Sequence, residues 1–204
     1  MVALIKAAKE RGFPAEIAVV ISNRADAAGL ALAAQEGVPT VTIESKPFGK
    51  DRAAFEAMLQ STLDAHQVEL ICLAGFMRLF TAKFVQAWYG RMLNIHPSLL
   101  PSFPGLDPHT QALKAGVKVS GATVHFVTPE TDAGPVVMQG VVEVRDDDTA
   151  DTLSARILAI EHQIYPNALR LLACGKLRLD AAICRLNDKA GAVGTLVSPQ
   201  PASE

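Results

Sequence analysis

Short, continuous apolar segments recur along the first half of the chain, and segments with helical spacing of apolar residues separate them. Short apolar runs rich in β-branched residues are typical of strands. A strand buried on both faces cannot alternate polar and apolar residues, so such runs indicate a parallel sheet covered by helices on both faces. We therefore predict an α/β fold with a doubly wound, mainly parallel sheet. The strands predicted in this part of the chain cover residues 16–22, 39–43, 68–75 and 91–95.

The second half of the chain predicts an antiparallel extension of this sheet. A proline-rich loop over residues 97–108 precedes two strand-like segments, at 121–127 and 135–144. Thr149 is a suitable N-cap for a long closing helix, with Asp151 in its first turn. The extension therefore follows the parallel strands directly along the chain.

One domain is expected over residues 1–186, followed by a flexible, polar tail over residues 187–204. The length of 204 residues and the hydrophobic content of 50% allow one complete core, and no repeat or linker divides the chain. The chain opens directly on helical spacing. A doubly wound domain ordinarily begins with a strand, so we expect the first strand to be absent from this chain.

The charge and the cysteines exclude several classes of protein. A net charge of -2 provides no basic field, so neither nucleic acid nor membrane is an expected partner. The three cysteines have no C-x-x-C spacing, which argues against a disulfide framework and a zinc site. No signal segment or membrane-spanning run is seen in the sequence. We therefore expect a cytoplasmic protein that uses no metal.

Asn94 and His96 form the first candidate pair for catalysis. They stand two residues apart at the end of a predicted strand, so their side chains share one face. Ligands of open α/β sheets bind beyond the carboxyl ends of the strands. An imidazole can donate a proton to a leaving amine, and an amide can donate a hydrogen bond to an oxyanion. The pair therefore suits acyl transfer.

Asp132, in the turn-rich segment TPETDAGP, is the candidate acidic partner of His96. A carboxylate beside an imidazole favours its protonated form. Ser98 is near in sequence, but no G-x-S-x-G motif surrounds it, so direct attack by a substrate amine fits better than a serine nucleophile. On spacing alone, a structural role for each residue remains the alternative.

Several long motifs resemble the folate-dependent formyltransferases of the phosphoribosylglycinamide type. LNIHPSLLPSFPGL, over residues 93–106, closely resembles their signature. AGFMRLF and GATVHFVTPETDAGPVVMQ, at residues 74–80 and 121–139, are similar to the same family in the same order, as are SNRADAAGLALA and EHQIYP. The resemblance covers residues 1 to about 180 and implies the formyltransferase fold.

What this resemblance implies is transfer of a formyl group from 10-formyltetrahydrofolate to the amine of glycinamide ribonucleotide, in purine synthesis and without a metal. His96 would protonate the departing folate nitrogen. Asn94 and His96 would stabilise the oxyanion, and Asp132 would favour the protonated form of His96 and order water. Small molecules would be the only partners, and the chain would act as a monomer or a homodimer.

The resemblance also implies two sets of binding residues. Gly75, Pro97 and Glu161 would contact the ribonucleotide, although Glu161 could equally be an exposed helix carboxylate. Core packing is the alternative for the apolar residues after residue 76. His125 could be a hydrogen-bonded strand residue, although in the family it lies by the active site. The folate would contact Arg52, Met77, Arg78, Leu79, Phe80, Asn94, Thr128, Pro129, Glu130, Thr131 and Asp132.

The chain departs from the family pattern in two places. Family members carry a glycine-rich phosphate loop before the first helix, and we expect both this loop and its strand to be absent here. Asp107 stands where relatives often have another polar residue or histidine. Two alternatives stay open: a formyltetrahydrofolate deformylase, which shares the N-I-H core and the acidic partner, and a non-catalytic folate- or nucleotide-binding module, which the missing phosphate loop favours. Methionyl-tRNA formyltransferase fits less well, because no RNA-binding domain is evident.

Overall fold

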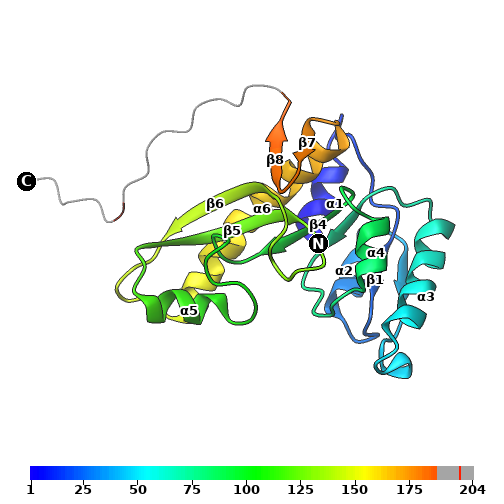
Figure 1. Ribbon diagram of the computed structural model, residues 1–204, viewed down its shortest axis with the longest axis horizontal. Helices are drawn as coiled ribbons and strands as arrows, with labels where there is room; N and C mark the ends of the chain where they lie inside the picture. Colours follow the sequence, from blue (N-terminus) through cyan, green and yellow to red (C-terminus); the bar gives the residue numbers. More distant parts are fainter. Residues whose placement is uncertain (188–197, 199–204) are drawn as a thin grey trace, which may run out of the picture.

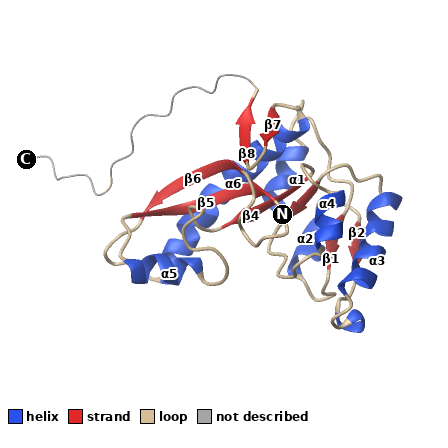
Figure 2. Ribbon diagram, in the orientation of Figure 1, coloured by secondary structure: helices blue, strands red, loops and turns tan. Residues whose placement is uncertain are grey.

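The computed structural model describes residues 1–187 and Ser198, and its strands form separate sheets that pack against helices (Figures 1 and 2). The N-terminal part contains α1 (Val2–Ala8), β1 (Val20–Ser22), α2 (Ala28–Gln35), β2 (Thr40–Thr42), a 3-10 turn (Lys46–Phe48), α3 (Arg52–Ala65), β3 (Ile71–Leu73) and α4 (Ala82–Ala87). The C-terminal part contains β4 (Met92–His96), α5 (Pro108–Ala115), β5 (Val119–Phe126), β6 (Val136–Glu143), α6 (Ala150–Ala173), β7 (Leu177–Asp180) and β8 (Ile183–Leu186).

Parallel and antiparallel pairing occur where the sequence predicts them. β1 pairs with β2 and β3 pairs with β4, both in parallel. β5 and β6 extend the second sheet on the antiparallel side of β4, giving the order β3-β4-β5-β6. The mixed α/β fold with an antiparallel extension is therefore confirmed. A hairpin of β7 and β8, which the sequence analysis did not identify, follows α6.

Apolar residues of β4 point to cores on opposite faces of its sheet. Met92 belongs to a cluster with α3 and α4, which includes Phe55 and Trp88. Leu93, the next residue, belongs to the cluster beneath α6. Alternate residues of a strand point to opposite faces, so β4 is covered on both sides and needs the continuous apolar run that predicted it.

The sheet is interrupted between β1 and β3. A cavity of about 1150 Å³ lies there, lined by residues from both strands, and no strand of the described residues fills it. The strands predicted at 16–22 and 68–75 shorten to β1 and β3, since their remaining residues find no ladder partner. The sequence pattern indicates a buried strand, but regular strand structure also requires a neighbour to pair with.

The closing helix begins as predicted. The Thr149 hydroxyl accepts a hydrogen bond from the Thr152 N–H at 3.2 Å, and the Thr149 N–H donates to the Thr152 hydroxyl, which completes a capping box. Asn187 belongs to the hairpin, because its N–H donates to the Lys176 carbonyl at 2.9 Å. The predicted tail beyond it lies outside the described residues, apart from Ser198. In the described part of the chain, no helix has the length and apolarity needed to cross a bilayer.

We expect α6 to tolerate shortening of a side chain on its exposed face but not on its buried face. Leu153 is fully buried against the sheet, whereas Leu158 on the same helix is 48% exposed. Leu153→Ala should lower the free energy of unfolding by about 2–5 kcal/mol, because it leaves a cavity. Leu158→Ala should change it by less than about 0.5 kcal/mol. Equal losses of unfolding free energy in the two variants, measured by urea denaturation, would contradict this packing.

Candidate functional site

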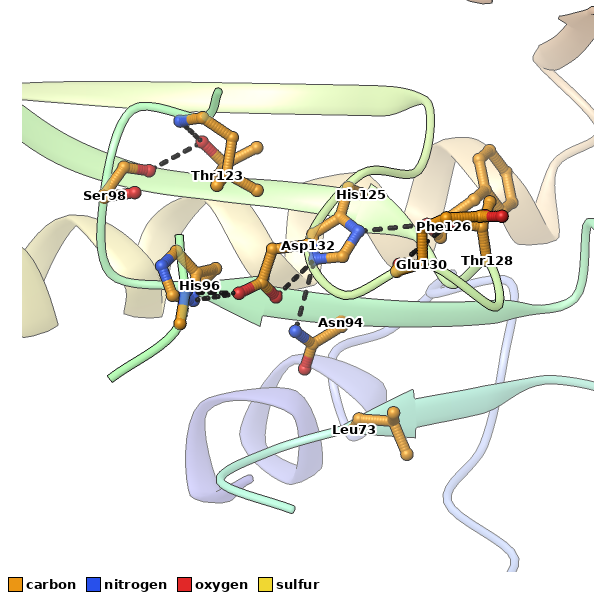
Figure 3. A network of polar contacts seen from close by, with 12 residues as sticks. Leu73, Asn94, His96, Ser98, Thr123, His125, Phe126, Thr128, Glu130 and Asp132 are labelled. Atoms are coloured by element: carbon orange, nitrogen blue, oxygen red, sulfur yellow. Dashed lines mark hydrogen bonds and ion pairs between the residues drawn. The ribbon is translucent and has the colours of Figure 1, made fainter. Parts of the chain in front are cut away.

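The predicted catalytic residues converge at the carboxyl end of β4 (Figure 3). Asn94 and His96 lie on one face of this strand, and Asp132 reaches them from the loop between β5 and β6. His96 Nδ1 lies 3.4 Å from Asp132 Oδ2. The two side chains are only 8% and 10% exposed, so their interaction is little screened by water.

Backbone groups of the loop that follows β4 fix both members of this pair. His96 Nε2 lies 3.0 Å from the Phe103 carbonyl oxygen, and the Gly105 N–H donates to Asp132 Oδ2 at 2.9 Å. A carbonyl can only accept, so Nε2 carries a hydrogen and donates it to Phe103. The nitrogen free to gain and lose a proton is therefore Nδ1, which faces Asp132.

Asn94 is oriented by His125, which stands opposite it on β5. His125 Nδ1 lies 2.9 Å from the Phe126 carbonyl, so it carries the hydrogen and leaves Nε2 as an acceptor. Asn94 Nδ2 donates to that nitrogen at 3.2 Å. An amide nitrogen has two hydrogens, so the second remains available for a substrate oxygen.

The environment of His125 keeps its ring neutral. Burial lowers the pKa of His125, and the nearby His96 lowers it further, whereas the Phe126 carbonyl and Asp132 act in the opposite direction. Asp132 Oδ1 is 3.8 Å from His125 Nε2, which is beyond hydrogen-bonding distance. With the ring neutral this contact is not an ion pair, and the shorter contact of the Asp132 carboxylate is with His96.

Strained backbone accompanies these contacts. Phe103, Asp107 and Asp132 all have positive φ values, of 56°, 52° and 53°. Side chains other than glycine rarely adopt this conformation, and such residues are concentrated at functional sites. At Asp132 it brings the carboxylate back over the sheet toward His96.

The predicted folate segment alternates in exposure. Met77 and Leu79 are 82% and 58% exposed. Arg78 instead lies over the Phe55 ring, with its guanidinium carbon 5.3 Å from the ring centroid. Phe80 is stacked between two other phenylalanines, so its side chain has the packing role that the sequence analysis held as the alternative.

The other predicted folate residues lie on two elements. Arg52 is exposed at the first position of α3. Pro129, Glu130 and Thr131 are exposed, and Thr128 is half-buried, with its hydroxyl donating to the Glu130 carbonyl at 3.2 Å.

Two of the three predicted ribonucleotide residues line one cavity next to α1 and α6. Gly75 and Glu161 line a cavity of about 260 Å³, and Pro97 directly follows β4. Glu161 is half-buried, and burial raises the pKa of its carboxyl group. Glu161 is therefore not the ordinary exposed carboxylate that was its alternative.

Sequence reasoning did not identify the groups that orient the candidate catalytic residues. The Phe103 carbonyl and the Gly105 N–H belong to the backbone, so no residue type indicates them. His125 could have been found from the sequence, because the corresponding histidine of the family lies by the active site. His109 follows the predicted turn on α5, and its Nε2 is buried with no hydrogen-bond partner among the described residues.

Comparison with known proteins identifies the class. The formyl transferase family model matches residues 1–169, and the chain belongs to this family. It is 42% identical over 177 residues to phosphoribosylglycinamide formyltransferase from Escherichia coli, covering 87% of this chain and 83% of that protein.

A second relative is the human trifunctional purine biosynthetic protein adenosine-3, at 46% identity over 189 residues. The match covers 92% of this chain but only 19% of that protein.

Solved structures agree with these relatives. Glycinamide ribonucleotide transformylase 1 from Symbiobacterium toebii superposes with a TM-score of 0.88 at 47% identity, covering 91% of this chain and 87% of the other. A formyltetrahydrofolate deformylase from Pseudomonas syringae is more distant, with a TM-score of 0.78 at 29% identity, covering 85% of this chain and 57% of the other.

The tautomer of His125 is a testable consequence of this geometry. At pH 7, we expect ¹⁵N NMR to find the ring neutral, with its hydrogen on Nδ1, and to find titration below the ordinary value of about 6.5. A hydrogen on Nε2 would contradict the proposed orientation of Asn94. Because folding lowers the pKa of His125, the stability that its neutral ring contributes is complete above about pH 6.5. It is lost as the pH falls through the lowered pKa.

Proposed function

We propose that this chain transfers a formyl group from 10-formyltetrahydrofolate to the amine of glycinamide ribonucleotide, a step of purine synthesis. The observation that carries the proposal is the approach of His96 Nδ1 to Asp132 Oδ2, at 3.4 Å, beside Asn94. The family match and the names of the relatives at 42% and 47% identity support the same reaction. A cytoplasmic location remains a prediction.

The reaction requires one bond to form and one to break at the formyl carbon. The amine nitrogen of the ribonucleotide attacks this carbon, and its oxygen becomes an oxyanion. Asn94 offers its free amide hydrogen to the oxyanion. The bond from carbon to the folate nitrogen then breaks, and that nitrogen takes the proton from His96 Nδ1. The carbonyl re-forms as this bond breaks, and the proton that the attacking amine loses passes to His96 Nδ1 through solvent, so the proton balance closes.

Asp132 supports this chemistry by placing a carboxylate oxygen 3.4 Å from His96 Nδ1. The Phe103 carbonyl accepts from the opposite ring nitrogen, so the imidazole is held from both sides. The Ser98 hydroxyl is fully buried and donates to the Ser102 carbonyl at 2.6 Å, which argues against a role as nucleophile.

The two substrates would approach from different sides. The folate would lie along the exposed Met77 and Leu79 and the loop from Thr128 to Asp132. The ribonucleotide would occupy the cavity beside Glu161, whose carboxylate can accept from sugar hydroxyls. The proposed transfer requires the two substrates to meet at Asn94 and His96.

One assay separates this function from its alternatives. Protein and 10-formyltetrahydrofolate are mixed with and without glycinamide ribonucleotide, and release of tetrahydrofolate is followed. We expect release that requires the ribonucleotide. Release without it would identify a deformylase, and folate binding without any release would identify a non-catalytic module. Either result would overturn the proposal.

His96→Ala should lower turnover by about a hundredfold to ten-thousandfold, because it removes the proton donor. Folate affinity, measured by calorimetry with tetrahydrofolate, should change by less than about threefold. The control is Ser98→Ala, which should retain most turnover if no serine is acylated. Loss of turnover in Ser98→Ala without loss of folding would reject direct amine attack.

Asp132→Asn should lower turnover by at least about tenfold, because the protonated His96 loses its neighbouring negative charge. Asp147→Asn, at an exposed carboxylate in the turn between β6 and α6, provides the matched control, and we expect less than about a twofold change in kcat. Equal effects in the two variants would show that Asp132 has no special role.

A further inference from the structure

Glu56 on α3 is a buried carboxylate that holds the end of the segment 76–80. It is 6% exposed. One carboxylate oxygen accepts from the Thr81 N–H at 2.5 Å, and the other accepts from the Thr81 hydroxyl at 2.5 Å. Thr81 follows the segment directly and is the N-cap of α4. Glu56 therefore fixes the point at which this segment joins the helix.

Two inward-pointing side chains of the segment, Phe76 and Arg78, are also held by α3. Phe76 stacks on Phe55 with a centroid separation of 6.4 Å, and Arg78 lies over the same ring at 5.3 Å. Phe55 and Glu56 are neighbours on α3, so one turn of this helix contacts the beginning, middle and end of the segment. With these inward positions fixed, Met77 and Leu79 must point outward.

Capping of α4 does not by itself require a carboxylate here. The Thr81 hydroxyl already accepts from the Phe84 N–H, as an N-cap residue does. Burying a carboxylate is costly unless a cation or several donors compensate it. Within residues 1–187, no lysine or arginine forms an ion pair with Glu56. Its cost is offset by its two bonds to Thr81.

The segment begins beside the catalytic residues. Leu73, the last residue of β3, is in register with Asn94 on β4. The residues after Leu73 therefore leave the sheet at the same edge, where α/β sheets bind ligands.

We propose that Glu56 is a positioning residue for the folate co-substrate. By bonding Thr81, it sets the conformation in which Met77 and Leu79 present their side chains outward to the folate. It touches neither substrate and acts only through the segment 76–80. This inference rests on the proposed function, since the folate is the ligand assigned to these two side chains.

The experiment compares three variants by steady-state kinetics with both substrates. Glu56→Ala removes both acceptors. Glu56→Gln keeps the shape, and its amide can still accept from the Thr81 N–H. Leu63→Ala is the matched control, because Leu63 is buried in the same core, one turn beyond Leu59 on α3, and has no bond to the segment. Thermal unfolding of each variant measures the accompanying loss of stability.

For Glu56→Ala we expect the KM for 10-formyltetrahydrofolate to rise about tenfold, with kcat and the KM for the ribonucleotide changed less than about threefold. Glu56→Gln should recover most of the folate affinity. Leu63→Ala should lose stability while keeping the folate KM. If Leu63→Ala raises the folate KM as much as Glu56→Ala, or if kcat alone falls, Glu56 is an ordinary structural residue.

Amide hydrogen exchange at residues 76–80 tests the positioning without using activity. Exchange there should be faster in Glu56→Ala than in Leu63→Ala, measured at equal margins below their unfolding temperatures. If the wild type shows no ribonucleotide-dependent release, the proposed function fails while the exchange result still tests the role of Glu56. Unchanged exchange in Glu56→Ala would overturn the positioning role even in an active enzyme.

Discussion

The antiparallel pairing of β4 with β5 is the constraint on which the site depends. It sets Asn94 opposite His125 and His96 opposite Thr123. Since strand side chains alternate between faces, a slip of one residue would turn Asn94 and His96 into the opposite core and break both pairs. The apolar neighbours Leu93 and Ile95 oppose such a slip, because Leu93 is fully buried and Ile95 packs against the same core.

The same pairing organises the loop that orients His96. Thr123 is fully buried, and its hydroxyl donates to the Ser98 carbonyl at 2.7 Å and accepts from the Leu100 N–H at 3.0 Å. The residues after β4 are therefore held against β5 before the loop turns outward. The loop then returns to place the Phe103 carbonyl at His96. Buried polar groups fully paired in this way specify one conformation.

Two different structural supports meet at the reacting centre. The polar side, with His96 and Asp132, rests on the β4–β5 pair and its loops. The apolar side, with Met77 and Leu79, rests on aromatic stacking and a buried carboxylate of α3. Under the proposed function, chemistry and folate affinity could therefore be altered separately, because the contacts named for one support are not those named for the other. The residues of both supports lie within residues 1–169, which the formyl transferase family model matches.

Local patterns were sufficient for much of the fold and for part of the site. The apolar runs predicted the buried strands, Thr149 predicted the start of α6, and two-residue spacing placed Asn94 and His96 on one face. Each of these properties depends on residues near in sequence. The hairpin of β7 and β8 and the shortened β1 and β3 were not predicted, because they depend on which strands find neighbours.

The sequence by itself thus determined the class of fold, the residue types able to perform formyl transfer and the face on which two of them lie. Only the tertiary structure decided that Asp132, 36 residues beyond His96, meets it at 3.4 Å, and that Glu56 bonds Thr81. Strand register and loop conformation bring these distant residues together. Backbone groups such as the Phe103 carbonyl enter the site in the same way, because every residue has one and only the folded path of the chain selects which one is used.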